Sequence, residues 1–357
     1  MVPRNFSSTE LAEKLDGLGS EISTSAGYEQ STITLSCPAK HIDKTLPLLL
    51  EVYQWANFPE DEFTTYQQRM IRNLEIEEKK TNAMATRYFL KRLWGSYPYG
   101  KKVIKEDFQS LTIEEVHEFH KNEILKNDVY LIVSGNFEIS QVHSLIEKYF
   151  GSLELHCSSS VSKSVTEQVV TTEGLYFHEM PNQVQSSLRI GHLSIPKSHE
   201  DYEELQVLGT LLGGFFGSRL MKNIREDKGY TYGIYGGFIG MKQKGYFMIS
   251  TDVANEYVDD TLKEIYKEIS RLQNEKVGEE ELQVVKNYLM GNLLSSLETP
   301  FQVADTLSLL RLNGLNTHHL QKTFERIKYI SPERILELAQ KYLKVEGGVT
   351  VIAGSKV

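Results

Sequence analysis

The sequence has little of three things that would place a protein in a specialised class. It has only two cysteines in 357 residues, Cys37 and Cys157, too few for a disulfide framework. Its longest strongly apolar stretch, Val207–Phe216, is about half of the roughly twenty residues that a membrane-spanning helix needs. Its 39 Lys and Arg are outnumbered by 48 Asp and Glu, which does not suit the phosphate backbone of nucleic acid. We therefore expect neither a membrane span nor nucleic-acid binding.

The low cysteine content does not distinguish between two cellular compartments. Few cysteines are typical of a reducing compartment, but periplasmic proteins can also have few. Residues 1–6 do not read as a signal peptide. On this sequence we expect a cytoplasmic protein, and a signal lying upstream would make it periplasmic.

What the sequence does contain is an internal repeat. Apolar residues make up 40% and charged residues 24%, as in ordinary globular proteins, and the length suits two domains. Residues 112–116 match residues 331–335, and residues 133–135 match residues 352–354, both at an offset of 219. A repeat of this length is not a solenoid unit, so it predicts two homologous domains.

Each half reads as strand, three helices and strand, which indicates an α+β fold. In the first half, Thr112-x-x-Glu115 is a capping box that predicts a helix start, and Ser331 followed by Pro332 is the matching start in the second half. The other elements expected in the first half are a strand at Ser31–Ser36, helices over Lys40–Ala56 and from Pro59 to about Lys80, and a buried strand at Val129–Val133.

The domain limits follow from the same reading. We expect a first domain at 1–155, a Ser-rich linker at 156–172 and a second domain at 173–357. The second half opens with strands between Glu173 and Ile195 and a helix at Asp201–Leu212. The first half instead opens on a capped helix at Ser7-x-x-Glu10, so its domain is predicted to lack an N-terminal segment of about forty residues.

The most informative block lies in the second half. Residues 213–220 read GGFFGSRL, and residues 225–232 read REDKGYTY. We expect a helix from about Phe216 to Asp227 that stops at Gly229 in the left-handed conformation. Strict alternation would then put Tyr230, Tyr232 and Ile234 on one face of a strand, with Arg225 and Tyr232 pointing into one cavity. An Arg fork and a phenol donor suit a peptide carbonyl and the oxyanion formed from it.

This block resembles the GG-x-x-x-SRL…IRE-x-KG-x-x-Y segment of the insulinase/pitrilysin-type metallopeptidases, the inverted zincins. The resemblance implies two αβ-roll domains of the kind found in mitochondrial processing peptidase. In the family, an Arg and a Tyr seven residues apart grip the substrate opposite the zinc. The resemblance therefore gives Arg225 and Tyr232 this catalytic role.

The zinc half of the family pattern is missing. The signature His-x-x-Glu-His occurs nowhere in these 357 residues. The family's third zinc ligand, a Glu about two dozen residues before the turn at 97–100, corresponds to Asn73, with Glu75 and Glu77 nearby. An Asn is a poor zinc ligand beside carboxylates and imidazoles. We therefore expect no metal and no cofactor in this chain, with zinc supplied by a partner.

The remaining histidines give no second site. His117 and His120 are three residues apart on an expected helix and would share a face, but no further ligands are identifiable, so we interpret them as an exposed helix face. His318 and His319 are adjacent and point apart on a helix. The glycines at 213, 214 and 217 do not form the dinucleotide pattern G-x-G-x-x-G.

The resemblance implies three functions. The first is the non-zinc, substrate-gripping subunit of a heterodimeric peptidase, acting on peptides and inactive without a homologous subunit that carries the zinc motif. The second is an N-terminally shortened form of a self-sufficient zinc peptidase. The third is a non-catalytic assembly or peptide-binding homologue, like the core subunits of the respiratory bc1 complex. Retention of both Arg225 and Tyr232 disfavours the third, and Asn73 argues against the second.

Overall fold

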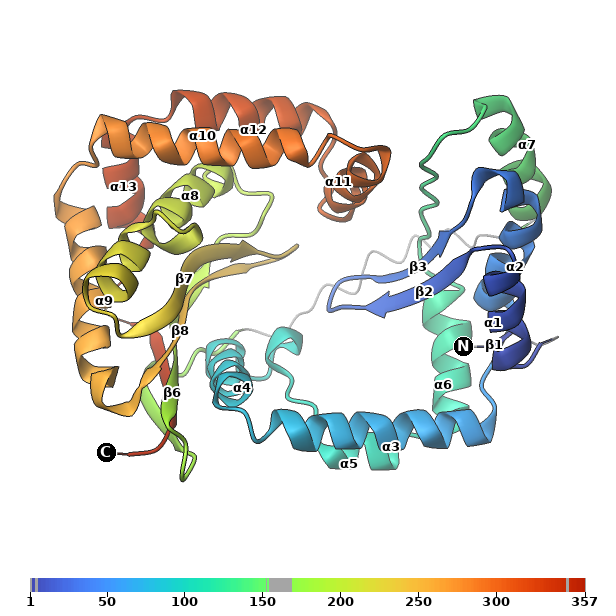
Figure 1. Ribbon diagram of the computed structural model, residues 1–357, viewed down its shortest axis with the longest axis horizontal. Coiled ribbons are helices and arrows are strands. Elements are labelled where there is room, and N and C mark those ends of the chain that lie inside the picture. Colours follow the sequence, from blue (N-terminus) through green and yellow to red (C-terminus); the bar gives the residue numbers. More distant parts are fainter. Residues whose placement is uncertain (1, 4–5, 152, 154–168, 345–346, 357) are drawn as a thin grey trace. The chain divides into compact units, whose positions relative to one another are not determined.

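The computed structural model describes residues 2–3, 6–151, 153, 169–344 and 347–356 (Figure 1). Most of the predicted linker, with Cys157, lies outside these residues. The chain divides into two compact units, which are described separately below. The first comprises residues 1–75 and 103–166, and the second comprises residues 76–102 and 167–357.

The second unit is built on one five-stranded sheet with the strand order β5-β9-β6-β8-β7. Neighbouring strands are antiparallel, except that β5 and β9 run parallel. The long strand β6 lies in the middle and pairs with both β8 and β9. The strands are β5 (Gly174–Glu179), β6 (Gln185–Ser194), β7 (Thr231–Gly240), β8 (Gly245–Ala254) and β9 (Val349–Gly354).

Helices of the same unit cover the apolar face of this sheet. Leu188 on β6 and Ile249 on β8 are fully buried in one core cluster, which also includes Leu208 and Ile265 from the helices. No helix among the described residues is both long enough and apolar enough to span a bilayer. The helices of the unit are α8 (Tyr202–Gly209), α9 (Val258–Asn274), α10 (Glu279–Ser295), α11 (Pro300–Leu312), α12 (His318–Tyr329) and α13 (Pro332–Tyr342), together with α4 (Thr81–Trp94), which packs on the other face of the sheet.

Helix α4 packs against β6 and β9 although it comes from the first half of the sequence. Arg189 on β6 donates from Nε to Thr86 Oγ1 at 2.9 Å and from Nη2 to the Asn82 carbonyl at 3.3 Å. Phe89 of this helix is fully buried. The unit therefore includes residues 76–102, whereas the sequence analysis placed all of 1–155 in the first domain.

The first unit is mainly helical and contains two short sheets among its described residues, β1 (Val2–Pro3) with β4 (Ala56–Asn57), and β2 (Glu21–Ala26) with β3 (Ser31–Ser36). The predicted capping boxes at Ser7/Glu10 and Thr112/Glu115 are confirmed, since in each the N-cap hydroxyl accepts the third backbone N–H. Its helices are α1 (Ser8–Gly17), α2 (Ile42–Gln54), α3 (Glu60–Glu77), α5 (Lys105–Ser110), α6 (Ile113–Phe119) and α7 (Ile139–Phe150).

The predicted duplication recurs in the order and spacing of the helices. Helices α3 and α10 begin at residues 60 and 279, α4 and α11 at 81 and 300, and α6 and α13 at 113 and 332. Each pair is 219 residues apart, the offset found in the sequence. The fold is therefore α+β with two homologous halves, as predicted.

The predicted buried strand at Val129–Val133 is wrong. These residues form no strand, and the side chains of Val129, Tyr130, Leu131 and Ile132 are 39–54% exposed. Their counterpart in the repeat is β9, which is held by hydrogen bonds to β5 and β6. The described residues of the first unit contain no counterpart of β5 or β6, the two strands that hold β9.

A buried carboxylate joins the start of α8 to α13. Asp201 is 6% exposed and accepts hydrogen bonds from Arg334 at 2.7 Å, Lys341 at 2.8 Å and Tyr342 at 2.6 Å. Burial disfavours its charged form, but the hydrogen bonds from Lys341 and Tyr342 and the charge of Arg334 outweigh burial and lower the pKa of Asp201 to about 2. This ion cluster stabilises the contact between the two helices.

We predict that Asp201→Asn lowers the free energy of unfolding by about 2 kcal/mol at pH 7. Because the folded pKa is depressed, this contribution is present above the unfolded value of about 4 and is lost as the pH falls toward 2. Urea unfolding of the wild type and the variant between pH 7 and pH 3 measures it. The gap between the two curves should narrow to about half by pH 3, because the folded pKa lies lower still.

The matched control is Asp260→Asn, which removes a carboxylate that pairs with Lys263 on the exposed surface of α9. Its effect should stay below about 0.5 kcal/mol. Equal effects of the two substitutions would contradict the role given to the Asp201 cluster.

Candidate functional site

Arg225 lies in a π-helical segment, η5 (Met221–Asp227). The backbone N–H of Lys228 donates to the Asn223 carbonyl, five residues earlier, which is the π-type hydrogen bond. The predicted helix start near Phe216 is too early, because residues 215–218 form turns and helical structure begins only at Arg219. The wider turn leaves Arg225 partly exposed near the end of the segment.

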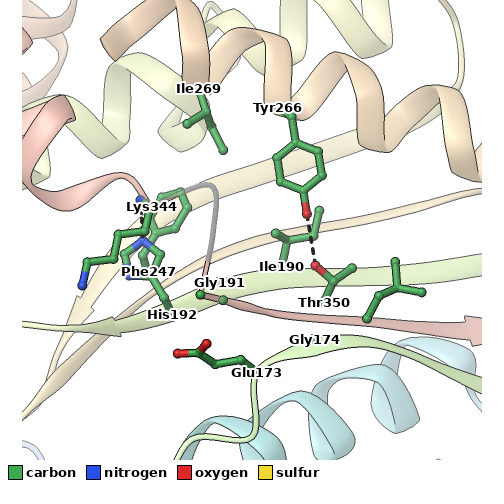
Figure 2. A pocket seen from close by; sticks show the side chains of 13 residues that line it. Glu173, Gly174, Ile190, Gly191, His192, Phe247, Tyr266, Ile269, Lys344 and Thr350 are labelled. Carbon is green, nitrogen blue, oxygen red and sulfur yellow. Dashed lines mark hydrogen bonds between the residues drawn. The ribbon is translucent and has the colours of Figure 1, made fainter.

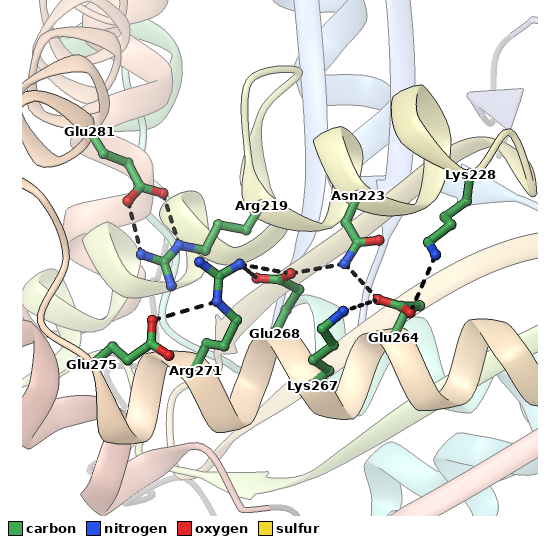
Figure 3. Close-up of polar contacts among 9 residues, drawn as sticks. All are labelled: Arg219, Asn223, Lys228, Glu264, Lys267, Glu268, Arg271, Glu275 and Glu281. Carbon is green, nitrogen blue, oxygen red and sulfur yellow. Dashed lines mark hydrogen bonds and ion pairs between the residues drawn. The ribbon is translucent and has the colours of Figure 1, made fainter.

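A polar network fastens η5 to α9 and α10 (Figure 3). Arg219 makes two hydrogen bonds of 2.9 Å to Glu281, a bidentate pair. Asn223 donates to both Glu264 and Glu268 on α9, each at 2.9 Å. Burial opposes ionisation of Glu281, but Arg219 outweighs burial and lowers its pKa. The segment that carries Arg225 is therefore tied to two neighbouring helices by charge-assisted hydrogen bonds.

Gly229 turns the chain from η5 into β7. Its φ of +68° is in the left-handed region, as predicted, and no atom lies within 4 Å of the place that a Cβ would occupy. The following Tyr230 stacks on Tyr257, with ring centroids 4.5 Å apart and planes at 12°. Gly229 therefore sets the direction in which β7 leaves the helix, while the stacked rings hold the residue after it.

A β-bulge at the start of β7 presents Tyr232 to solvent. The register with β8 shifts between Thr231 and Ile234, both of which are buried, whereas Tyr232 is 91% exposed. Thr231 Oγ1 holds the bulge, because it lies 2.8 Å from the carbonyl oxygens of Gly233 and Asp252 and accepts the Gly233 N–H. The predicted alternation of Tyr230, Tyr232 and Ile234 on one face is thus wrong, since a bulge adds a residue to one strand.

Arg225 and Tyr232 keep their hydrogen-bond donors unused within the described residues. The Arg225 guanidinium lies 4.6 Å over the Phe216 ring and makes no ion pair there. No hydrogen bond from the Tyr232 hydroxyl reaches another described residue, and its side chain is almost fully exposed. A guanidinium and a phenol with free donors can both bind a carbonyl or carboxylate oxygen.

A cavity of about 450 Å³ adjoins the two residues. The cavity is lined by Phe216, whose ring lies under the Arg225 guanidinium, and by Gly233, which follows Tyr232. Arg225 and Tyr232 themselves do not line it. The sequence analysis did not identify Phe216 as a support for Arg225, although Phe216 lies in the Gly-rich block at residues 213–220. It also missed Tyr235 and Asp252, which line the same cavity and reach it through strand pairing.

Close backbone contact shapes this cavity. Segment η4 (Thr210–Gly214) lies against β7, and Gly213 forms a bridge with Gly236. A Cβ on Gly213 would come within 2.5 Å of the Gly236 nitrogen. Glycine is therefore required there, and the contact places Phe215 and Phe216 beside β7.

His120 and His319 contact neighbouring polar groups of the protein. His120 is 7% exposed, and its Nε2 lies 2.8 Å from the Tyr53 carbonyl, so the expected exposed helix face is wrong for this residue. Burial lowers its pKa. His319 lies 2.8 Å from Glu203. Across the described ranges, no group of three or more His, Cys, Asp or Glu side chains is placed to hold a metal ion.

A second cavity of about 400 Å³ lies between the sheet and α9 (Figure 2). His192 in its wall is engaged at both ring nitrogens, because Nδ1 lies 3.0 Å from the Leu193 carbonyl and Nε2 accepts the Lys344 N–H at 3.3 Å. Burial also lowers the pKa of His192. The ring is a neutral structural group with no nitrogen left for a ligand.

We predict that Gly229→Ala destabilises the chain by about 1 kcal/mol, because alanine is strained at this positive φ even though space is open. Gly291→Ala is the control, since Gly291 lies inside α10 with open space and an ordinary φ. It should stabilise by about 0.5–1 kcal/mol. Urea unfolding of both variants measures the difference, and stabilisation by Gly229→Ala would contradict the turn described here.

Comparison with known proteins places the chain in a family. Residues 110–289 match the family described as the peptidase M16 inactive domain. An uncharacterized zinc protease of Rickettsia felis is 24% identical over 333 residues, which cover 92% of this chain and 76% of that protein. A probable inactive metalloprotease of Bacillus subtilis is 26% identical over 213 residues, which cover 59% of this chain and 49% of that protein.

A solved structure shows the same fold. The crystal structure of a peptidase M16 inactive domain from Pseudomonas fluorescens superposes with a TM-score of 0.85 at 24% identity, over 99% of this chain and 86% of that chain. The resemblance of the chain to this metallopeptidase family is confirmed by the family match and the relatives. The chain belongs to the peptidase M16 inactive domain family.

Proposed function

We propose that this chain is the non-zinc, substrate-gripping subunit of a heterodimeric metallopeptidase. A homologous partner subunit would carry the zinc, its bound water and the general-base Glu. Arg225 would hold the substrate carbonyl and the oxyanion that forms from it, and Tyr232 would donate a second hydrogen bond. The observation that carries the proposal is this pair of side chains with unused donors on either side of the Gly229 turn.

The local geometry supports such a role. The network around Asn223 and Arg219 fixes the segment before Arg225, and the Thr231 bulge fixes the strand that carries Tyr232. Donors held in place before the reaction stabilise a developing oxyanion without the cost of reorganising. Such residues are suited to a polypeptide substrate, whose carbonyls are regularly spaced acceptors.

We predict that Arg225→Ala or Tyr232→Phe lowers kcat of the assembled complex by about 10²–10³, the effect of removing one oxyanion donor. The assay is hydrolysis of a quenched-fluorescent peptide pool with zinc supplied, by this chain mixed with a zinc-motif homologue from the same genome. Sedimentation should show that both variants still assemble. Tyr329→Phe, which changes another exposed tyrosine in the same unit, is the matched control and should leave kcat unchanged.

The same assay separates the alternatives. Activity of this chain alone would indicate a self-sufficient peptidase and would contradict the proposal. Normal turnover by both variants in an active mixture would remove the roles given to Arg225 and Tyr232.

A further inference from the structure

A carboxylate, that of Asp252, lines the cavity beside Arg225 and Tyr232. Asp252 lies on β8, and its side chain is 44% exposed. Its Oδ1 is buried and has no hydrogen-bond partner among the described residues, so the exposed part of the side chain includes the other oxygen, Oδ2. The only cation paired with it among the described residues is Arg189, at 3.8 Å. A ligand in the cavity would therefore pair with the exposed Oδ2 and not with the buried Oδ1.

Arg189 is already committed to the protein. Its Nε, Nη1 and Nη2 donate to Thr86 Oγ1, the Leu188 carbonyl and the Asn82 carbonyl, and its side chain is only 10% exposed. A guanidinium held in this way has few donors left for an anion in the cavity. Of the two charged groups in the wall, Asp252 is the more available, so the cavity favours a cationic ligand group.

Aromatic rings form the rest of the wall. Phe216 is 61% exposed and Tyr235 is 47% exposed. Phe215 is braced by Tyr288, with ring centroids 5.1 Å apart. The Arg225 guanidinium already lies over the Phe216 ring, so this wall attracts cations as well as apolar chains. Lysine and arginine side chains combine both properties, because a long apolar stem carries the charge.

We propose that this cavity is a subsite for a lysine or arginine side chain of the bound peptide, with Asp252 as the residue that determines specificity. The proposal rests on the function proposed above, because Arg225 and Tyr232 would hold the peptide backbone beside the subsite. The ammonium or guanidinium would pair with Asp252, and the stem would lie along Phe216 and Tyr235. The net charge of −9 also favours encounter with basic peptides.

The test is direct peptide binding by this chain, measured by fluorescence anisotropy. The probes are unstructured labelled peptides that differ at one position, which is arginine, norleucine or glutamate, in a set that moves this position along the peptide. At low salt the wild type should bind the best arginine peptide about tenfold more tightly than its norleucine twin. Asp252→Asn should reduce this ratio to near one while leaving the norleucine peptide within about twofold.

Glu226→Gln is the matched control. It removes one negative charge from the exposed surface beside Arg225, outside the cavity, and should change the ratio by less than about twofold. An equal effect of Glu226→Gln and Asp252→Asn would overturn the proposal, because general charge would then explain the preference. Absence of an arginine preference in the wild type would overturn it even if the Asp252 variant failed to fold.

Arg225→Ala separates this proposal from the proposed function. Weaker binding of every peptide with an unchanged arginine-to-norleucine ratio would support both. If Arg225→Ala changes nothing while Asp252→Asn removes the preference, the subsite stands and the gripping role fails. If Arg225→Ala weakens binding and the wild type shows no preference, the gripping role stands and the subsite fails.

Discussion

The contact between the backbones of Gly213 and Gly236 is the constraint on which the candidate site depends. A Cβ at position 213 would come within 2.5 Å of the Gly236 nitrogen, so η4 can lie against β7 only because residue 213 has no side chain. This close approach brings the two phenylalanines that follow η4 beside the edge of the sheet. Both line the cavity, and Phe216 supports the Arg225 guanidinium. The Gly-rich block is therefore a packing device with a functional consequence, and not a phosphate loop.

The two gripping residues are held by different means on the two sides of Gly229. Before the turn, the π-helical segment and the residues just ahead of it are tied to α9 and α10. Arg219 pairs with the oppositely charged Glu281, and the Asn223 amide donates to two carboxylates of α9. After the turn, Thr231 satisfies the backbone groups that the bulge leaves unpaired. The supports are buried or paired, whereas Arg225 and Tyr232 make no side-chain hydrogen bond to another described residue. This division between fixed supports and unused donors is expected of a preorganised binding site.

The sequence predicted those features that depend on neighbouring residues. The capping boxes at Ser7 and Thr112 and the left-handed Gly229 each follow from local chemistry, and the repeat follows from residue matches at one offset. The features that depend on distant partners were not predictable. The strand expected at Val129–Val133 failed because pairing partners decide whether an apolar run becomes a strand. Asp252 gave no local signal, since only the pairing of β8 with β7 brings it to the cavity.

The π-type geometry of η5 is also a reason why a regular helical and strand periodicity does not describe the segment around Arg225 and Tyr232. An α-helix continued from Phe216 would impose 3.6 residues per turn, but the hydrogen bond from Lys228 to Asn223 encloses an additional residue. The strand that follows then gains a second irregularity in its bulge, so neither the helical nor the strand period holds between residues 221 and 234. Each irregularity interrupts the regular pattern of backbone hydrogen bonds. The π-helical segment contains Arg225, and the bulge contains Tyr232. Such departures from regular structure concentrate where a site needs a side chain in a direction that a regular helix or strand does not give.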